Sequence, residues 1–237
     1  MISVCLASYN GGEAIKVQIS SILKQLSYDD ELVISDDGSV DNTINNIMDF
    51  RDSRIKLFHN VSSKKGPTGN FENVLKQAVG DFIFLADQDD IWLEGRVKRH
   101  MELLHQYDLV ISDATVVDEN GRVIYESFFA QRRSKSGLIN NLLRNSYIGC
   151  CMSFRKSLLN KILPFPRKIH MHDWWIGLVA EVYGKVKFCD ERLLNYVRHE
   201  NNASPTLQNS NYSFFKRLSN RFDLLAGLIS LYFYGNK

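Results

Sequence analysis

Short apolar runs alternate with amphipathic segments along the first half of the chain. The runs are rich in Ile, Leu, Val and Phe, as in buried strands, and comprise residues 2–7, 31–35, 55–58 and 82–86. Between them, residues 15–26 and 70–78 carry apolar side chains at helical spacing. Because strands that alternate with helices usually pair in parallel, residues 1–112 predict an α/β fold. We expect a doubly wound, mainly parallel central sheet with helices on both faces.

The pattern changes after residue 112. Residues 114–125 predict a hairpin about the Asn120-Gly121 pair, which is a strong turn signal. Further apolar runs predict strands at 109–112, 148–154, 186–188 and 193–197. Helical spacing predicts helices at 137–144 and 173–183. We expect this half to add a small antiparallel extension to the same sheet.

Residues 211–237 predict a C-terminal amphipathic helix, with Lys216, Arg217 and Arg221 beside its apolar positions. Such a helix either lies on a membrane or packs on its own domain or on a partner subunit of a homo-oligomer. No stretch reaches the roughly 18 apolar residues that span a bilayer, and a strand that begins at Ile2 does not resemble a signal peptide. We therefore expect a cytoplasmic protein, peripheral at the inner face of the cell membrane if the helix binds lipid.

Composition narrows the class of protein. The 237 residues carry a formal net charge of +2, which gives no indication of nucleic-acid binding. The length suits one domain with an elaborated second half. The four cysteines form no C-x-x-C pair, so we interpret them as reduced, buried thiols; they are Cys5, Cys150, Cys151 and Cys189.

Polar clusters follow three of the predicted strands, at the point where each strand ends. They are Ser-Tyr-Asn at 8–10, Asp-Asp-Gly-Ser at 36–39 and Asp-Gln-Asp-Asp at 87–90. In doubly wound sheets, ligands bind outside the carboxyl ends of the strands, so three such clusters predict one site. Clustered carboxylates repel one another, and Mg²⁺ or Mn²⁺ would relieve that repulsion and bind phosphate. The sequence therefore predicts a site for a metal ion and a diphosphate.

These motifs resemble those of the inverting family 2 glycosyltransferases, which have the GT-A fold. The matching motifs occur in the family's order at 7–11, 35–43, 87–92, 149–155 and 172–175. The form Asp-Gln-Asp-Asp-x-Trp is similar to the rhamnosyltransferase-like branch, which builds bacterial surface polysaccharides. The resemblance implies hexosyl transfer from dTDP-rhamnose or a UDP-hexose to a glycan or lipid-linked acceptor, with Mg²⁺ or Mn²⁺ as cofactor. It also implies a nucleotide-sugar-binding half at 1–112 and an acceptor-binding half of the same domain at 113–210.

The resemblance assigns residues to the nucleotide. Ala7 and Tyr9 would line the base pocket, with the Tyr9 ring as a stacking surface. Asp37 would accept a hydrogen bond from the imide N–H of uracil or thymine, and Asp36 would support Asp37 or contact the ribose. Asn70 either caps a helix or contacts the nucleotide or sugar.

Three further carboxylates would act around the diphosphate. Asp87 and Asp89 are two residues apart, and in an extended strand such side chains point the same way. We expect Asp89 to bind the metal directly, and Asp87 to bind the ribose or a metal-bound water. Asp90 would contact the donor sugar. Lys64 and Lys65 are either solvated loop charges or neighbours of the diphosphate.

The acceptor chemistry would lie in the second half. Asp173 is expected to be the general base that takes the proton of the acceptor hydroxyl, with Asp113 or Glu200 next in line. Adjacent indoles would raise its pKa by desolvation. Trp174 and Trp175 would also offer an apolar platform to a sugar ring of the acceptor.

Arg198 and His199 follow the last predicted strand and would lie near the diphosphate or the metal, with residues 201–204 as a loop over the site. Other functions stay open on the residues alone. An aspartyl phosphohydrolase acting on sugar nucleotides would prefer Thr or Val at position 91, where this chain has Ile91. A nucleotidylyltransferase would need a basic residue after the first strand. A degenerate glycan-binding module would not need the intact carboxylates.

Overall fold

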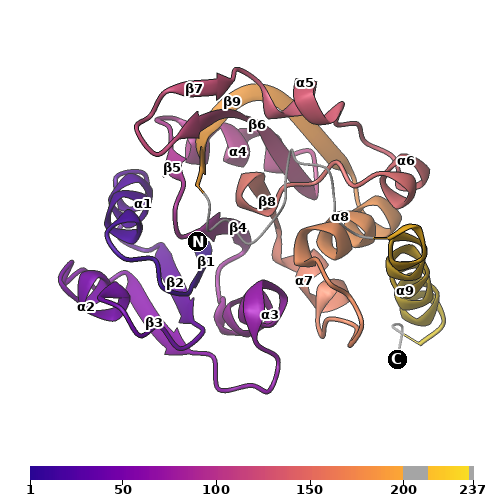
Figure 1. Cartoon of the computed structure of the whole chain (residues 1–237), viewed down its shortest axis with the longest axis horizontal. Coiled ribbons are helices and arrows are strands. Elements are labelled where there is room, and N and C mark those ends of the chain that lie inside the picture. The colour runs from indigo at the N-terminus through magenta and orange to yellow at the C-terminus, as the bar shows by residue number, and fades with distance from the viewer. Residues whose placement is uncertain (200–212, 235–237) are drawn as a thin grey trace.

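The computed structural model describes residues 1–199 and 213–234 (Figure 1). Within these residues, nine strands form one sheet in the order β3-β2-β1-β4-β8-β6-β9-β5, with β7 paired to β6. The first elements are β1 (Ile2–Ser8), α1 (Ala14–Leu23), β2 (Glu31–Asp36), α2 (Thr43–Met48), β3 (Ile55–His59), α3 (Gly66–Gln77) and β4 (Phe82–Asp87). Strands β1 to β4 pair in parallel, as the sequence predicted.

The second half completes the sheet. Its strands are β5 (Ile91–Trp92), β6 (Leu109–Asp118), β7 (Val123–Tyr125), β8 (Met152–Arg155) and β9 (Val186–Arg198). Its helices are α4 (Arg96–Leu104), α5 (Phe128–Arg132), α6 (Leu138–Leu143), α7 (Lys156–Ile162), α8 (His172–Tyr183) and α9 (Phe214–Tyr234). β8 runs antiparallel between β4 and β6, whereas β6 and β9 are parallel. The predicted α/β class, with its parallel centre and antiparallel extension, is confirmed.

The connection between β4 and β5 shows that the sheet curls. Three intervening strands separate β4 from β5 along the sheet, yet only residues 88–90 join them in sequence. Four strand spacings amount to about 19 Å on a flat sheet, whereas four Cα steps reach at most about 14 Å. The sheet must therefore bend, and Figure 1 shows β6 and β9 arching over the end of β4. This bend brings the 87–90 cluster to the end of β9.

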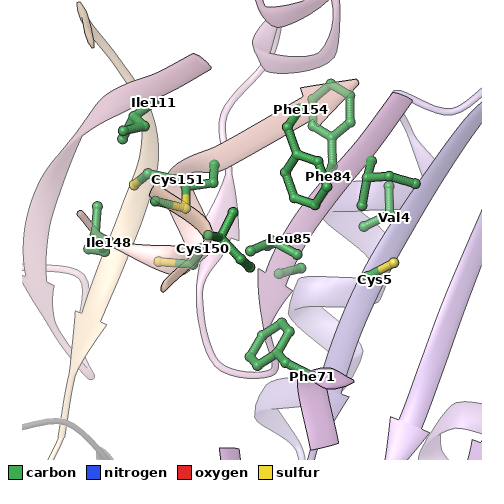
Figure 2. Close-up of a cluster of buried hydrophobic side chains, with 14 of the residues drawn as sticks. Val4, Cys5, Phe71, Phe84, Leu85, Ile111, Ile148, Cys150, Cys151 and Phe154 are labelled. Carbon is green, nitrogen blue, oxygen red and sulfur yellow. The ribbon is translucent and has the colours of Figure 1, made fainter. Parts of the chain in front are cut away.

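One hydrophobic core extends across both halves. Val4 of β1, Phe84 of β4 and Phe154 of β8 pack in a single cluster (Figure 2). All four cysteines are free and buried, as predicted. The expected boundary at residue 112 falls inside β6, so the nucleotide-binding and acceptor-binding halves proposed from the sequence share a strand as well as a core.

Several predicted elements have different bounds in the structure. Residues 149–151 form a 3-10 turn before β8, because the Cys150 carbonyl accepts a hydrogen bond from the Arg96 guanidinium (2.7 Å) and not from a neighbouring strand. The helix expected at 70–78 begins at Gly66, since Pro67 is well tolerated in a first helical turn. The runs 186–188 and 193–197 join as β9, where a register shift against β6 absorbs the residues between them.

The expected C-terminal helix is present as α9, which packs against α6 and α8. Leu224 and Leu228 are buried in that contact, while many of the other apolar side chains of α9 are exposed. Among the described residues, no helix combines the length and the apolar character needed to cross a membrane.

Candidate active site

The carboxyl ends of β1, β2 and β4 lie side by side at one edge of the sheet. Ser8 at the end of β1 is in register with Asp36 at the end of β2, and Ala7 is in register with Asp87 at the end of β4. The half-buried Ala7 therefore lies between the second and third polar clusters. All three clusters meet at this edge.

Asp36 organises the loop that follows β2. Its buried carboxylate accepts hydrogen bonds from the backbone N–H groups of Gly38 (3.0 Å) and Ser39 (2.8 Å). The hydroxyls of Ser8 (3.0 Å) and Ser39 (2.5 Å) also donate to it. Four protein donors satisfy most of the lone pairs of this carboxylate. This arrangement suits the supporting role expected of Asp36 better than a contact with ribose.

Asp37 faces the segment that leads into α3. One carboxylate oxygen accepts from the Gly66 N–H (2.6 Å), and the other accepts from the side-chain amide of Asn60 (2.9 Å). Lys65 Nζ lies 3.5 Å from the second oxygen. Each oxygen retains a lone pair that can accept an imide N–H. Lys65 is thus next to the carboxylate expected to read the base.

Gln88 fixes the backbone of Tyr9, a role that the sequence interpretation missed. The Tyr9 N–H donates to Gln88 Oε1 (2.8 Å), and Gln88 Nε2 donates to the Tyr9 carbonyl (3.0 Å). A Cβ on Gly11 would lie 2.7 Å from the same Gln88 oxygen, so a side chain there would displace the amide. The Tyr9 ring is 55% exposed, which leaves a face for a base to stack on.

Asn70 lies within α3 and does not cap it, because the helix already begins at Gly66. Its Nδ2 donates to the Ser8 carbonyl (3.0 Å), while its buried Oδ1 has no hydrogen-bond partner among the described residues. Lys64 is engaged elsewhere, in an ion pair with Glu72 (2.6 Å) and a hydrogen bond to the Phe165 carbonyl (3.3 Å). This geometry favours a structural role for Lys64.

The carboxylates at 87–90 contact the end of β9. Because β4 ends at Asp87, Asp89 lies in the following turn, and strand periodicity does not align the two side chains as the sequence interpretation assumed. Asp89 Oδ2 is 2.7 Å from His199 Nε2. Asp90 accepts a hydrogen bond from the Val197 N–H (3.1 Å), and its other oxygen is buried without a partner among the described residues.

Electrostatics at this cluster favour a bound cation. Burial, followed by repulsion from Asp89 and Asp173, raises the pKa of Asp87 to about 7. Burial, followed by repulsion from Asp89 and Asp87, raises the pKa of Asp90 well above its usual range. The hydrogen bond with Asp89 raises the pKa of His199. Carboxylate oxygens suit Mn²⁺ or Mg²⁺, and a divalent charge would relieve the repulsion.

Asp90 and Cys150 lie deeper than Asp89. Ligand atoms of Asp87, Asp90 and Cys150 lie within 4.8 Å of one another. Asp90 is almost fully buried, and burial strongly raises the pKa of the Cys150 thiol, so that sulfur stays protonated and is a poor ligand for a hard ion. Asp87 and Asp89, together with His199, therefore fit a cation better than Asp90 and Cys150 do. The burial of Asp90 does not suit the contact with a donor sugar that the sequence suggested.

Asp173 lies in the first turn of α8, where Met171 and not Asp173 is the N-cap. Its carboxylate accepts a hydrogen bond from the adjacent Trp174 N–H (2.6 Å). Burial raises its pKa to about 6, although this hydrogen bond and the nearby Arg132 favour the charged form. A carboxylate with a pKa near the working pH can accept a proton from a hydroxyl group.

The two indoles beside Asp173 belong to the core. Trp174 and Trp175 are only 6% and 1% exposed, and each N–H donates to a backbone carbonyl, that of Asn141 (2.7 Å) or Ile162 (2.9 Å). Their burial leaves little ring surface for the expected sugar platform. The burial of these two indoles does account for the desolvation of Asp173.

The remaining candidates differ in position. Asp113 is buried and accepts hydrogen bonds from the Ala114 and Phe129 N–H groups and from the Ser127 hydroxyl. Its oxygens therefore hold the start of α5, which leaves it poorly suited to act as a base. Arg198 ends β9 beside His199. Glu200 and the loop expected at 201–204 lie outside the described residues.

A curled α/β sheet thus brings acidic turns and an imidazole to one edge, near the buried carboxylate of Asp173. The family model of Glycosyl transferase family 2 matches residues 3–163. The chain belongs to this family and is a glycosyltransferase, as its motifs indicated.

Relatives and solved structures agree with this assignment. The glucosyltransferase WfgD of Escherichia coli, described as UDP-Glc:alpha-D-GlcNAc-diphosphoundecaprenol beta-1,3-glucosyltransferase, is 33% identical over 180 residues, which cover 75% of this chain and 68% of WfgD. The dTDP-rhamnosyl transferase RfbG of Shigella flexneri is 28% identical over 214 residues, covering 83% and 72%. The S. aureus TarS 1-349 fragment crystallised with UDP-GlcNAc superposes with a TM-score of 0.74 at 19% identity, covering 96% of this chain and 66% of that fragment. This chain spans about two thirds of the length of WfgD and RfbG.

Proposed function

We propose that this chain transfers a hexose from a pyrimidine nucleoside-diphosphate sugar to a lipid-linked saccharide, with inversion and with a divalent cation. UDP-hexoses and dTDP-rhamnose are the donor candidates, because Asp37 can accept the imide N–H of either base. The relatives that act on diphosphoundecaprenol-linked sugars support a lipid-linked acceptor and a role in bacterial surface polysaccharide synthesis. Such an acceptor would bring the enzyme to a membrane surface.

The observation that carries the proposal is that Asp87 lies near two carboxylates with different expected roles. Burial raises the pKa of Asp87 most, and repulsion from Asp89, which contacts His199, and from Asp173 raises it further. A diphosphate bound near Asp89 and an acceptor hydroxyl near Asp173 would therefore both come close to Asp87. An in-line displacement requires that the two reacting groups be held close together.

The residues perform distinct parts of the reaction. Asp89 and His199, with Asp87, would hold the cation, which supplies positive charge to the leaving diphosphate. Asp173 takes the proton of the acceptor hydroxyl as the hydroxyl oxygen bonds to the anomeric carbon. The bond from that carbon to the diphosphate oxygen breaks on the opposite face, and the anomeric configuration inverts.

A transfer assay tests the proposal. The purified chain is incubated with a polyprenyl-diphosphate-linked saccharide in detergent and with UDP-glucose or dTDP-rhamnose, and NMR gives the anomeric configuration of the product. We expect an inverted product with Mn²⁺, none after chelation with EDTA, and recovery when Mn²⁺ is restored. Asp89→Asn should remove this activity, whereas Asp49→Asn, at an exposed position of the fold, should retain it.

A parallel measurement separates the alternative enzyme classes. Release of free sugar and nucleoside diphosphate without acceptor, at a rate equal to that with acceptor, would point to hydrolysis. A product that retains the donor configuration would contradict the role of Asp173 as base in a single displacement.

A further inference from the structure

Helix α9 is apolar on two opposite faces. The inner face packs on the domain through Asn220, Leu224 and Leu228, all of which are buried. Seven large apolar side chains form an outer stripe that is between 42% and 80% exposed: Phe215, Leu218, Phe222, Leu225, Ile229, Tyr232 and Phe233. A surface helix of a globular protein normally exposes polar residues on this side. An exposed apolar stripe of this size is typical of an interaction surface.

The stripe continues onto α6. The Arg221 guanidinium donates hydrogen bonds to the carbonyls of Leu142 (3.1 Å) and Leu143 (2.5 Å), which ties α9 to the end of α6. On α6, the side chains of Ile139 and Leu143 are 74% and 65% exposed. We call the outer stripe together with Ile139 and Leu143 the α6–α9 face. Its two helices lie side by side in Figure 1.

Positive charge is concentrated on the two helices of this face. Residues 138–144 and 213–234 carry four cationic side chains and a single carboxylate, that of Asp223, although the whole chain has a formal net charge of only +2. The cations are Arg144, Lys216, Arg217 and Arg221. A partner that complements this surface is anionic as well as apolar.

The inner face of α9 packs on elements of the candidate acceptor site. Asn220 of α9 lies 3.3 Å from the His170 ring, two residues before α8 begins. A Cβ on Gly227 would lie 3.0 Å from the Trp175 ring, so α9 packs closely on the helix that carries Asp173. A surface bound to the outer stripe would therefore lie about one helix diameter, roughly 10 Å, from the side of α9 that contacts α8.

We propose that the α6–α9 face docks on an anionic phospholipid bilayer, with α9 lying in the plane of the headgroups. Aromatic and aliphatic side chains flanked by Lys and Arg are the features that hold an amphipathic helix at a lipid surface. A second copy of the chain fits less well, since a two-fold contact through this face would bring its cations against identical cations. The inference rests on the α6–α9 face and not on the proposed sugar chemistry.

Vesicle flotation tests the proposal. The wild-type chain should float with vesicles of phosphatidylglycerol and phosphatidylethanolamine, should not float with phosphatidylcholine alone, and should be released by salt. Phe222→Ser should weaken binding at least about tenfold. The matched control is Tyr28→Ser, which removes a more exposed aromatic ring (85%) from the loop before β2 and should leave binding unchanged.

A charge variant provides a second arm that leaves the apolar stripe intact. Lys216→Gln with Arg217→Gln should weaken binding about fivefold for each charge removed. Equal flotation of the wild type and Phe222→Ser, or no flotation of the wild type, would overturn the proposal. A dimer in light scattering that Phe222→Ser dissociates would assign the face to a second copy instead. Transfer to a water-soluble acceptor analogue is measured separately, so loss of the docking face and loss of the enzymatic proposal are distinguishable.

Discussion

At the scale of single residues, Asp113 and Asp173 were both candidates for the general base on sequence alone. Their surroundings in the structure differ. Asp113 accepts hydrogen bonds from two backbone N–H groups and one hydroxyl, all within the protein. Asp173 has the Trp174 N–H and the attraction of Arg132, yet burial still raises its pKa to about 6. A raised pKa makes Asp173 the better proton acceptor of the two.

Substitution separates these roles. Asp173→Asn removes the proton acceptor but keeps the volume, so we expect kcat to fall roughly 10²- to 10⁴-fold while the dissociation constant of the nucleoside diphosphate is unchanged. Asp113→Asn is the contrasting variant. It should keep kcat and lower the thermal midpoint, because it weakens a buried hydrogen-bond network. Calorimetry, turnover and thermal unfolding distinguish the two, and normal turnover in Asp173→Asn would move the base elsewhere.

The raised pKa of Asp173 also predicts a pH dependence. The carboxylate is the active form, so kcat/KM should fall about tenfold per pH unit below pH 6 and level off above it. Saturating Mn²⁺ keeps Asp87 ionised, which removes its titration from the profile. The pH–rate profile from pH 5 to pH 8 checks this. A flat profile down to pH 5 would show that a different group takes the proton.

At the scale of elements, the turn between β4 and β5 links the nucleotide side of the site to its metal side. Gln88 bonds to the backbone of Tyr9, Asp89 contacts His199, and Asp90 contacts Val197. Three successive side chains of one turn thus bind two segments that are distant in sequence. Gln88, the middle residue of the D-x-D motif, therefore positions the backbone of Tyr9.

This function predicts a binding defect without a chemical defect. Gln88→Ala removes two hydrogen bonds to Tyr9, each worth about 0.5–1.5 kcal/mol at most for an exposed pair. We expect the KM for the donor to rise roughly three- to tenfold and kcat to change less than about twofold. Steady-state kinetics with Gln106→Ala as the exposed control gives the comparison. A fall in kcat at constant KM would contradict the positioning role.

The elements also show which structural features the sequence could and could not predict. Strands β1 to β4 have bounds within one residue of the predicted runs, because each run is mostly apolar and ends at an acidic or polar turn. The turn at 149–151 could not be predicted, since it depends on a hydrogen bond from Arg96, a distant residue. Asp89 and His199 were each candidates, but their contact follows from the bend of the sheet and not from any local pattern.

At the scale of the whole molecule, folding buries two carboxylates of the site. Burial, with repulsion from Asp89 and Asp173, raises the pKa of Asp87 to about 7, and burial raises the pKa of Asp173 to about 6. A carboxyl group with a raised folded-state pKa contributes full stability below its unfolded pKa, and that stability is lost as the pH rises through the folded value. The metal-free protein should therefore be less stable at pH 7.5 than at pH 5.

A divalent cation reverses this loss, which gives the last prediction. At a concentration 100 times its dissociation constant, Mn²⁺ should stabilise the fold by about 2.7 kcal/mol, or roughly 5–10 °C in thermal midpoint for a chain of this size. The increment should be larger at pH 7.5 than at pH 5, because protons compete with the metal for the same carboxylates. Thermal unfolding with and without Mn²⁺ at both pH values measures it. Asp89→Asn should lose most of the increment and Asp49→Asn should keep it, whereas equal increments in both variants would place the cation away from the edge where β4 meets β9.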